Sequence, residues 1–288
     1  INVDASKLQY RNKFHRFQYN REQAFAPKFN KALKEQYQQF LIEYKSSRNT
    51  TSALMSISAM PIMAVLQPLY LDAGTHWGSY VYSTLPKAPK AAKRNKSLFE
   101  VKRRAPIGFN QEMVDLINQY FKSDILSTSQ GITETTRDII SVVMQIANEE
   151  GRDLDWIEEQ LTTESTDLNR NRSRLIARTE TVTATNQAAW FAAAKVGLLM
   201  IKEWLSASDN RVRTDHANVN GYKIGFEDYF QVGTNRMLIP GAKVQENGLP
   251  TDAKEVCNCR CCAIYTPYRN MRGELVEFDY NVGVPVMG

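Results

Sequence analysis

Hydrophobic and polar positions alternate at helical spacing through most of the first two thirds of the chain. In the first 45 residues, aromatic side chains recur at intervals of three and four, as at Phe25, Phe29, Tyr37, Phe40 and Tyr44. This spacing predicts an apolar stripe along one or two long helices. Such a stripe is more typical of core or helix–helix packing than of a platform for stacking bases.

Further helices are expected between residues 109 and 205, where apolar positions again follow a period near 3.6. The longest uninterrupted pattern covers 168–205. Capping residues define the ends of the others. The expected signals are an N-cap at Asn110 for a helix ending near Ser127, an N-cap at Thr133 for a helix ended by Gly151, and an N-cap at Asp153 for a helix over 154–161.

The pattern changes after residue 205, where glycines and prolines separate short mixed runs. Such runs predict strands near 222–224, 261–266 and 275–278. We therefore expect a mainly α fold with a small α+β C-terminal module, in which long helices are followed by short strands and loops. The expected divisions are a helical basic docking region 1–85, a basic linker 86–106, a C-terminal module 107–270 and a tail 271–288.

Charge is distributed unevenly along the 288 residues. The net charge is +5, but residues 1–104 carry +12 and residues 105–288 carry −7. A basic front half predicts an anionic partner, either nucleic acid or an acidic protein surface, although a solvated basic face has the same composition. The basic linker 86–106 is expected either to bind DNA without sequence specificity or to follow an acidic groove of a protein partner. Its basic residues are Lys87, Lys90, Lys93, Arg94, Lys96, Lys102, Arg103 and Arg104.

An uncharged stretch, 49–71, is long enough to span a bilayer. It also contains Ser56, Ser58 and Gln67, and Pro61 and Pro68 interrupt it. These features favour a buried, kinked helix, so no membrane association is expected. No secretory signal is visible, and clustered free cysteines fit a reducing compartment.

All four cysteines lie in the six residues Cys257-Asn-Cys-Arg-Cys-Cys262, so they cannot form a disulfide framework between distant segments. One interpretation is a zinc site formed by His216, Cys257, Cys259 and Cys262, with His216 as the distant ligand. The alternative is that Cys259 and Cys261 alternate on a strand as small buried hydrophobes, with His216 in a structural role.

Charged residues near these positions allow two interpretations. Carboxylates at Glu180, Asp209 and Asp215 could serve acid–base chemistry, and a Cys–His pair could provide a nucleophile. The sequence shows no phosphate-binding glycine loop and no oxyanion device, so no enzyme activity and no catalytic residue are expected. A structural ion-pair network is favoured, formed by Arg174, Arg178, Glu180, Asp209, Arg211, Arg213 and Arg260.

An ordered series of residues over about 110–265 resembles the phage Mu F-like minor head protein family, also called the phage head morphogenesis family. The series contains Arg174-Leu-Ile-Ala-Arg-Thr-Glu180, Ala184, Asn186, Ala188, Gly197, Trp204, Asp209, Arg211, Arg213, His216, Gly221, Phe226, Phe230, Leu238-Ile-Pro-Gly241, Pro250 and Cys257-Asn-Cys-Arg-Cys261. The sequence departs from the family pattern in the extra thiols at Cys257 and Cys262 and in Ala242, where an Asp is common. Residues 1–104 resemble no family.

The resemblance implies a structural minor capsid protein of a tailed bacteriophage. Such a protein would be assembled in the host cytoplasm and would lie in the virion, inside the head near the portal. Its expected partners are the portal protein, the major capsid protein or both, with non-specific contact to genomic DNA. The alternative is a DNA-binding accessory protein that is ejected with the genome or governs its delivery.

Overall fold

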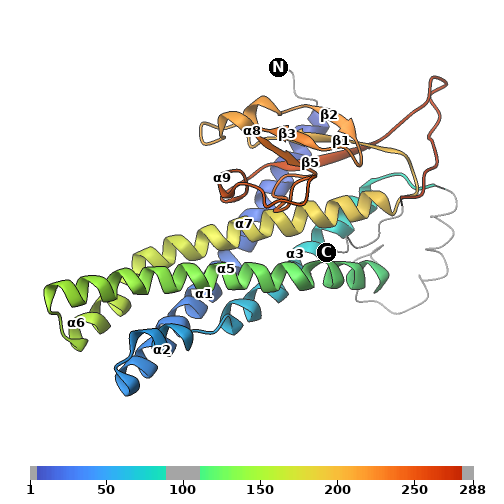
Figure 1. The fold of residues 1–288 in the computed structure, drawn as a ribbon. Coiled ribbons are helices and arrows are strands. Elements are labelled where there is room, and N and C mark those ends of the chain that lie inside the picture. The colour runs from blue at the N-terminus through green and yellow to red at the C-terminus, as the bar shows by residue number, and fades with distance from the viewer. Residues whose placement is uncertain (1–4, 89–110, 281–288) are drawn as a thin grey trace. The chain divides into compact units, whose positions relative to one another are not determined.

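The computed structural model describes residues 5–88 and 111–280 and confirms a mainly helical chain with short antiparallel strands in its C-terminal region (Figure 1). The helices are α1 (Ala5–Ser47), α2 (Thr50–Met55), α3 (Met60–Thr84), α5 (Gln111–Glu150), α6 (Leu154–Glu159), the π-helical turn η1 (Gln160–Glu164), α7 (Ser165–Ala194), α8 (Thr214–Asn218) and α9 (Ala253–Val256). The strands are β1 (Met200–Leu205), β2 (Lys223–Gly225), β3 (Phe230–Val232), β4 (Asn235–Met237) and β5 (Cys262–Pro267).

The start and stop signals around residue 150 are confirmed. Gly151 follows α5 with φ +65°, a left-handed conformation that glycine adopts without strain. The Asp153 carboxylate then accepts a hydrogen bond from the Trp156 backbone N–H at 2.9 Å, which caps α6. Both features are local, so the sequence alone could specify them.

The predicted helix cap at Thr133 is wrong, because α5 runs unbroken through this position for 40 residues. The Thr133 hydroxyl donates to the Ser129 carbonyl at 2.7 Å, one turn back in the same helix. It also accepts a hydrogen bond from the Gln36 side chain at 2.7 Å. A threonine can satisfy its hydroxyl inside a helix in this way, so it does not have to mark a helix start.

The predicted helix over 168–205 is also wrong in its last third. Helix α7 ends at Ala194, Gly197 takes a φ of +72°, and the chain continues as β1. Strand β1 pairs with β2 on one side and β5 on the other. Since these pairings join residues far apart in sequence, they override the local preference for helix.

The uncharged stretch forms α2 and about the first half of α3, and Pro68 lies inside α3. Ile62, Leu66 and Leu69 are fully buried. Among the described residues, one stretch, Thr50–Thr84, has the length and composition of a membrane span, and 33% of its most apolar window is buried. The core helix of a soluble protein can meet the same two criteria.

The chain forms two compact units, and each draws on separate parts of the sequence. Unit 1 contains Ile1–Arg21, Tyr70–Tyr120 and Arg178–Gly288, and unit 2 contains Glu22–Leu69 and Phe121–Ala177. Unit 1 therefore combines residues from three of the predicted divisions, which are 1–85, 107–270 and 271–288.

Unit 2 is an all-helical core with a polar centre. Its buried residues include Tyr37, Phe40, Ile140 and Met144. The fully buried Gln36 binds both Thr133 and Thr136 through its side-chain amide, so this buried polar group is satisfied by the neighbouring helix.

Unit 1 contains the three-stranded antiparallel sheet β2-β1-β5 and the hairpin β3-β4. The pairing of β1 with β5 brings Leu205 opposite Cys262. The N-terminal part of α1 also contributes, since the Tyr10 hydroxyl donates to the Ala263 carbonyl at 3.1 Å. These strands and helix ends position the site described below.

Residues 275–278, predicted as a strand, form only isolated bridges to 198 and 269. Leu199 N–H donates to the Val276 carbonyl at 2.8 Å, and the buried Tyr280 ring packs 4.2 Å from the Phe226 ring. The described part of the predicted tail, 271–280, therefore packs within unit 1.

Candidate functional site

The cysteine-rich segment is a tight turn between α9 and β5. Asn258 occupies the left-handed region with φ 60°, which reverses the chain between Cys257 and Cys259. Helix α7 holds this turn: the Asn258 N–H donates to Thr179 Oγ1 at 2.9 Å, and Arg178 Nη1 donates to Asn258 Oδ1 at 2.5 Å. Asparagine tolerates this backbone conformation better than most residues, which explains the choice at this position.

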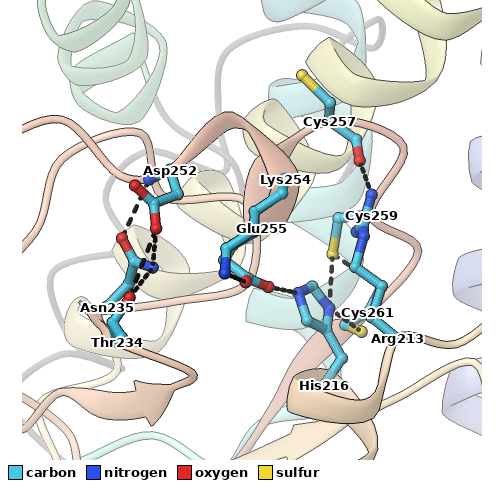
Figure 2. A network of polar contacts seen from close by, with 10 residues as sticks. All are labelled: Arg213, His216, Thr234, Asn235, Asp252, Lys254, Glu255, Cys257, Cys259 and Cys261. Carbon is cyan, nitrogen blue, oxygen red and sulfur yellow. Dashed lines mark hydrogen bonds and ion pairs between the residues drawn. The ribbon is translucent and has the colours of Figure 1, made fainter.

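The turn brings two cysteines to one histidine of α8 (Figure 2). His216 Nδ1 lies 3.3 Å from Cys261 Sγ and 3.7 Å from Cys259 Sγ. The side chains are buried, with residue exposures of 2% for His216, 1% for Cys259 and 2% for Cys261. We call these three residues the His–Cys cluster.

A buried carboxylate holds the other side of the imidazole. Glu255 of α9 is 1% exposed, and its Oε2 lies 2.9 Å from His216 Nε2. Lys254 Nζ lies 3.5 Å from the second carboxylate oxygen, Oε1. Glu255 thus holds Nε2 of the ring, and Nδ1 faces the two sulfur atoms.

Charge and burial act in opposite directions on the cluster. The hydrogen bond with Cys261, followed by the interactions with His216, lowers the pKa of Cys259 well below its usual value. Burial raises the pKa of Cys261 well above its usual value. Burial alone would lower the pKa of His216, but its contacts with Cys259 and Glu255 outweigh burial and raise it.

Two cysteines of the predicted zinc set lie outside the His–Cys cluster. Cys257 is exposed, and its carbonyl accepts a hydrogen bond from Arg213 Nη2. Cys262 is fully buried in β5, where burial raises its pKa. Cys261 joins the cluster instead, because side chains two residues apart along an extended segment point to the same side. No pattern in the sequence predicted Glu255 as a partner of His216.

The predicted ion-pair network is divided into separate contacts. Arg260 binds the Asp209 carboxylate through both Nη atoms, with Nη2 2.7 Å from Oδ1, and this interaction lowers the pKa of Asp209. Arg211 lies 3.8 Å from the same carboxylate. Arg178 and Arg213 instead bind the cysteine turn, as described above, and Arg174 is exposed on α7.

Glu180 has partners that the sequence did not indicate. The 5%-exposed Glu180 accepts a hydrogen bond from the Tyr70 hydroxyl and an ion pair from Lys243 Nζ at 2.7 Å. Lys243 Nζ also lies 3.1 Å from the Tyr70 oxygen. These residues are far apart in sequence, and no local pattern connects them.

Of the eight basic residues predicted to bind DNA or an acidic partner, only Lys87 lies among the described residues. Its Nζ donates to the Leu85 carbonyl at 3.2 Å and lies 4.6 Å from the Tyr82 ring centroid. Burial lowers its pKa. The other seven lie outside the described residues and are Lys90, Lys93, Arg94, Lys96, Lys102, Arg103 and Arg104.

Comparison with protein families identifies the segment that carries the cluster. Residues 138–264 match the model of the phage Mu protein F like family. This segment is similar to the phage Mu F-like family. It begins within α5, ends within β5 and includes α7, β1 and the whole His–Cys cluster. No curated protein and no solved structure matches the chain significantly.

The phage Mu F-like domain implies a phage head morphogenesis protein. The family also implies a place in the virion and interactions with other head proteins. The sequence resemblance to this family is therefore confirmed.

Proposed function

We propose that the protein is a structural minor component of the phage head that binds the portal protein or the inner capsid during assembly. The observation that carries this proposal is the match of residues 138–264 to the phage Mu F-like family. The domain contributes a long helix, α7, held to the sheet by buried polar contacts, which suits a rigid assembly element better than a mobile catalytic one.

The part of α1 that belongs to unit 2 offers a basic docking surface. Lys28, Lys31 and Lys34 are exposed, and the Lys31 side chain is 81% accessible. Residues 1–104 together carry a net charge of +12. A positive surface of this kind would steer the protein towards an acidic ring or lumen and would fix its orientation on encounter.

We further propose that the protein acts without catalytic turnover. The nucleophile–base arrangement among the described residues is the His–Cys cluster, and its three residues are at most 2% exposed. A catalytic cysteine would need access for a substrate carbonyl or phosphoryl group. Burial of the cluster therefore favours a structural role.

Cross-linking mass spectrometry on purified virions of the encoding phage tests the docking. Links from Lys28, Lys31 or Lys34 to the portal protein are expected, and the exposed Lys122 of α5 provides an internal comparison. Absence of the protein from virions would contradict the proposal.

A charge-reversal pair sharpens this test. Lys31→Glu with Lys34→Glu should reduce incorporation into heads, because two exposed cations become anions. Lys122→Glu with Arg272→Glu makes the same change in net charge at two other exposed positions and should leave incorporation intact. Equal loss in both double variants would indicate an effect of net charge alone and would contradict docking through α1.

A second candidate is a DNA-binding accessory protein, which the basic composition of 86–106 supports. Its affinity for duplex DNA of arbitrary sequence should fall linearly on a log–log plot with salt concentration, because bound phosphates release counterions. Fluorescence anisotropy of the full chain at several salt concentrations measures this slope. A flat salt response, or no binding at low salt, would remove this candidate without affecting the head-assembly proposal.

A further inference from the structure

We propose that His216 Nδ1, Cys259 Sγ and Cys261 Sγ bind a zinc ion that locks the cysteine turn to α8. Such a site does not depend on which head protein is the partner. The three ligand atoms lie within 4.8 Å of one another, and all three residues are buried. Two thiolates and one imidazole form a donor set that zinc accepts readily.

The two nitrogen–sulfur distances match a tetrahedral centre. With zinc–sulfur bonds of about 2.3 Å and zinc–nitrogen bonds of about 2.0 Å, tetrahedral angles place sulfur and nitrogen about 3.5 Å apart. The observed separations from His216 Nδ1 are 3.3 Å to Cys261 and 3.7 Å to Cys259. Both nitrogen–sulfur separations are therefore close to those that a bound zinc ion requires.

Two sulfur atoms converge on one ring nitrogen of the buried His216. Without a metal, protons are shared between these three atoms by hydrogen bonding. A zinc ion takes the place of those protons, because two thiolates and a neutral imidazole are the forms of these side chains that bind it. The second ring nitrogen, Nε2, is held by Glu255.

The residues around the ligands fit a metal site. Zinc-binding histidines commonly donate their second ring N–H to a carboxylate, and Glu255 accepts that proton at 2.9 Å. The Cys261 backbone N–H points at Cys259 Sγ, with N and S 3.4 Å apart, and such a contact favours a thiolate. The Trp204 ring lies edge-on to the His216 imidazole at 5.5 Å, which excludes water from one side.

The site joins segments that are distant in sequence. His216 lies on α8, while Cys259 and Cys261 belong to the turn that leads into β5, 43 and 45 residues later. The three protein ligands come from both segments. Metal binding would therefore stabilise the packing of α8 against the turn.

Metal analysis of the purified full chain tests the proposal. Elemental analysis should find one zinc per chain, and X-ray absorption at the zinc edge should find two sulfur neighbours and light-atom neighbours. Cobalt substitution should produce thiolate-to-cobalt charge-transfer absorption. These measurements use the unaltered protein, so they remain informative even where a substitution disturbs folding.

Single substitutions then identify the ligands. Cys259→Ser and Cys261→Ser should each lose zinc, whereas the exposed Cys257→Ser is the matched control and should retain it. Glu255→Gln should weaken zinc binding about 10–100-fold without removing it. Circular dichroism establishes that each variant is folded.

Two results would overturn the proposal. The first is a chain that binds no zinc after reduction and incubation with the ion, which would leave an imidazolium–thiolate pair as the state of the cluster. The second is zinc retained by a folded Cys259→Ser, Cys261→Ser double variant.

Discussion

The side-chain amide of Asn186 closes the outer edge of β5 at Ala263. Asn186 Oδ1 accepts the Ala263 N–H at 3.0 Å, and Asn186 Nδ2 donates to the Cys261 carbonyl at 3.1 Å. Strand β5 lies at the edge of the sheet, so its outward backbone groups have no strand partner. A fully buried side chain of α7 replaces that partner directly beside the His–Cys cluster.

Asn186→Ala should destabilise the protein by about 2–4 kcal/mol, because one backbone N–H and one carbonyl would be left buried without partners. Urea unfolding followed by circular dichroism measures the change. Asn247→Ala provides the control, since Asn247 is exposed and its side chain accepts a single local bond from Leu249 N–H. An Asn186→Ala variant as stable as this control would contradict the assigned role.

Lys243→Met should destabilise the protein by about 3 kcal/mol, because it leaves the buried Glu180 carboxylate without its cation. Adding Glu180→Gln should recover part of this loss, since the uncharged amide still accepts the Tyr70 hydroxyl. Thermal or urea unfolding of the two single variants and the double variant gives the coupling free energy. Strictly additive effects would show that the pair is not energetically coupled.

Gly241→Ala and Gly248→Ala form a matched pair that separates backbone strain from packing. Both glycines have φ near +80°, so an alanine is strained at either position. At Gly241 a Cβ would also lie 3.2 Å from Val182 Cγ1 and 3.4 Å from the Thr183 Cα, whereas nothing lies within 4 Å at Gly248. We expect Gly241→Ala to cost about 1–3 kcal/mol more in unfolding free energy.

Equal losses in the two alanine variants would contradict close packing of the turn at Gly241 against α7. The Thr183 hydroxyl donates to the Gly241 carbonyl at 3.0 Å, which holds this turn in place. Urea unfolding of both variants under the same conditions measures the difference.

Stability should rise with pH between about 7 and 9 because of Lys202. This lysine of β1 is fully buried, its Nζ has no hydrogen-bond partner among the described residues, and burial lowers its pKa to about 7 despite the nearby Glu227 and Asp228. The unfolded chain retains a pKa near 10.5, so it binds more protons than the folded chain in this range. Folding is therefore penalised below pH 7 and is relieved of that penalty as pH rises.

The contribution of Lys202 amounts to about 2 kcal/mol between pH 7 and pH 9. Lys202→Met should remove it, so the difference in unfolding free energy between the parent protein and the variant should shrink as pH increases. Titration of the cysteines contributes equally to the unfolding free energy of both proteins, so it cancels in this difference. A pH-independent difference would show that Lys202 gains no proton on unfolding, which means that its pKa is not lowered in the folded protein.

The sequence by itself determined the features that depend on near neighbours. The mainly α fold with a small α+β module, the end of α5 at Gly151 and the Asp153 cap all follow from periodicity and capping within a few residues. The resemblance of the C-terminal half to the phage Mu F-like family was visible for a related reason, since the spacing of its residues is a property of the linear chain.

The tertiary structure alone decided which side chains meet. The sequence could not choose Cys261 over Cys257 or Cys262, because that choice depends on the left-handed turn at Asn258 and on where α8 places His216. It also extended a helix through β1, since only pairing with β2 and β5 makes that segment a strand. Contacts between residues tens of positions apart stabilise these arrangements, and local propensity does not contain them.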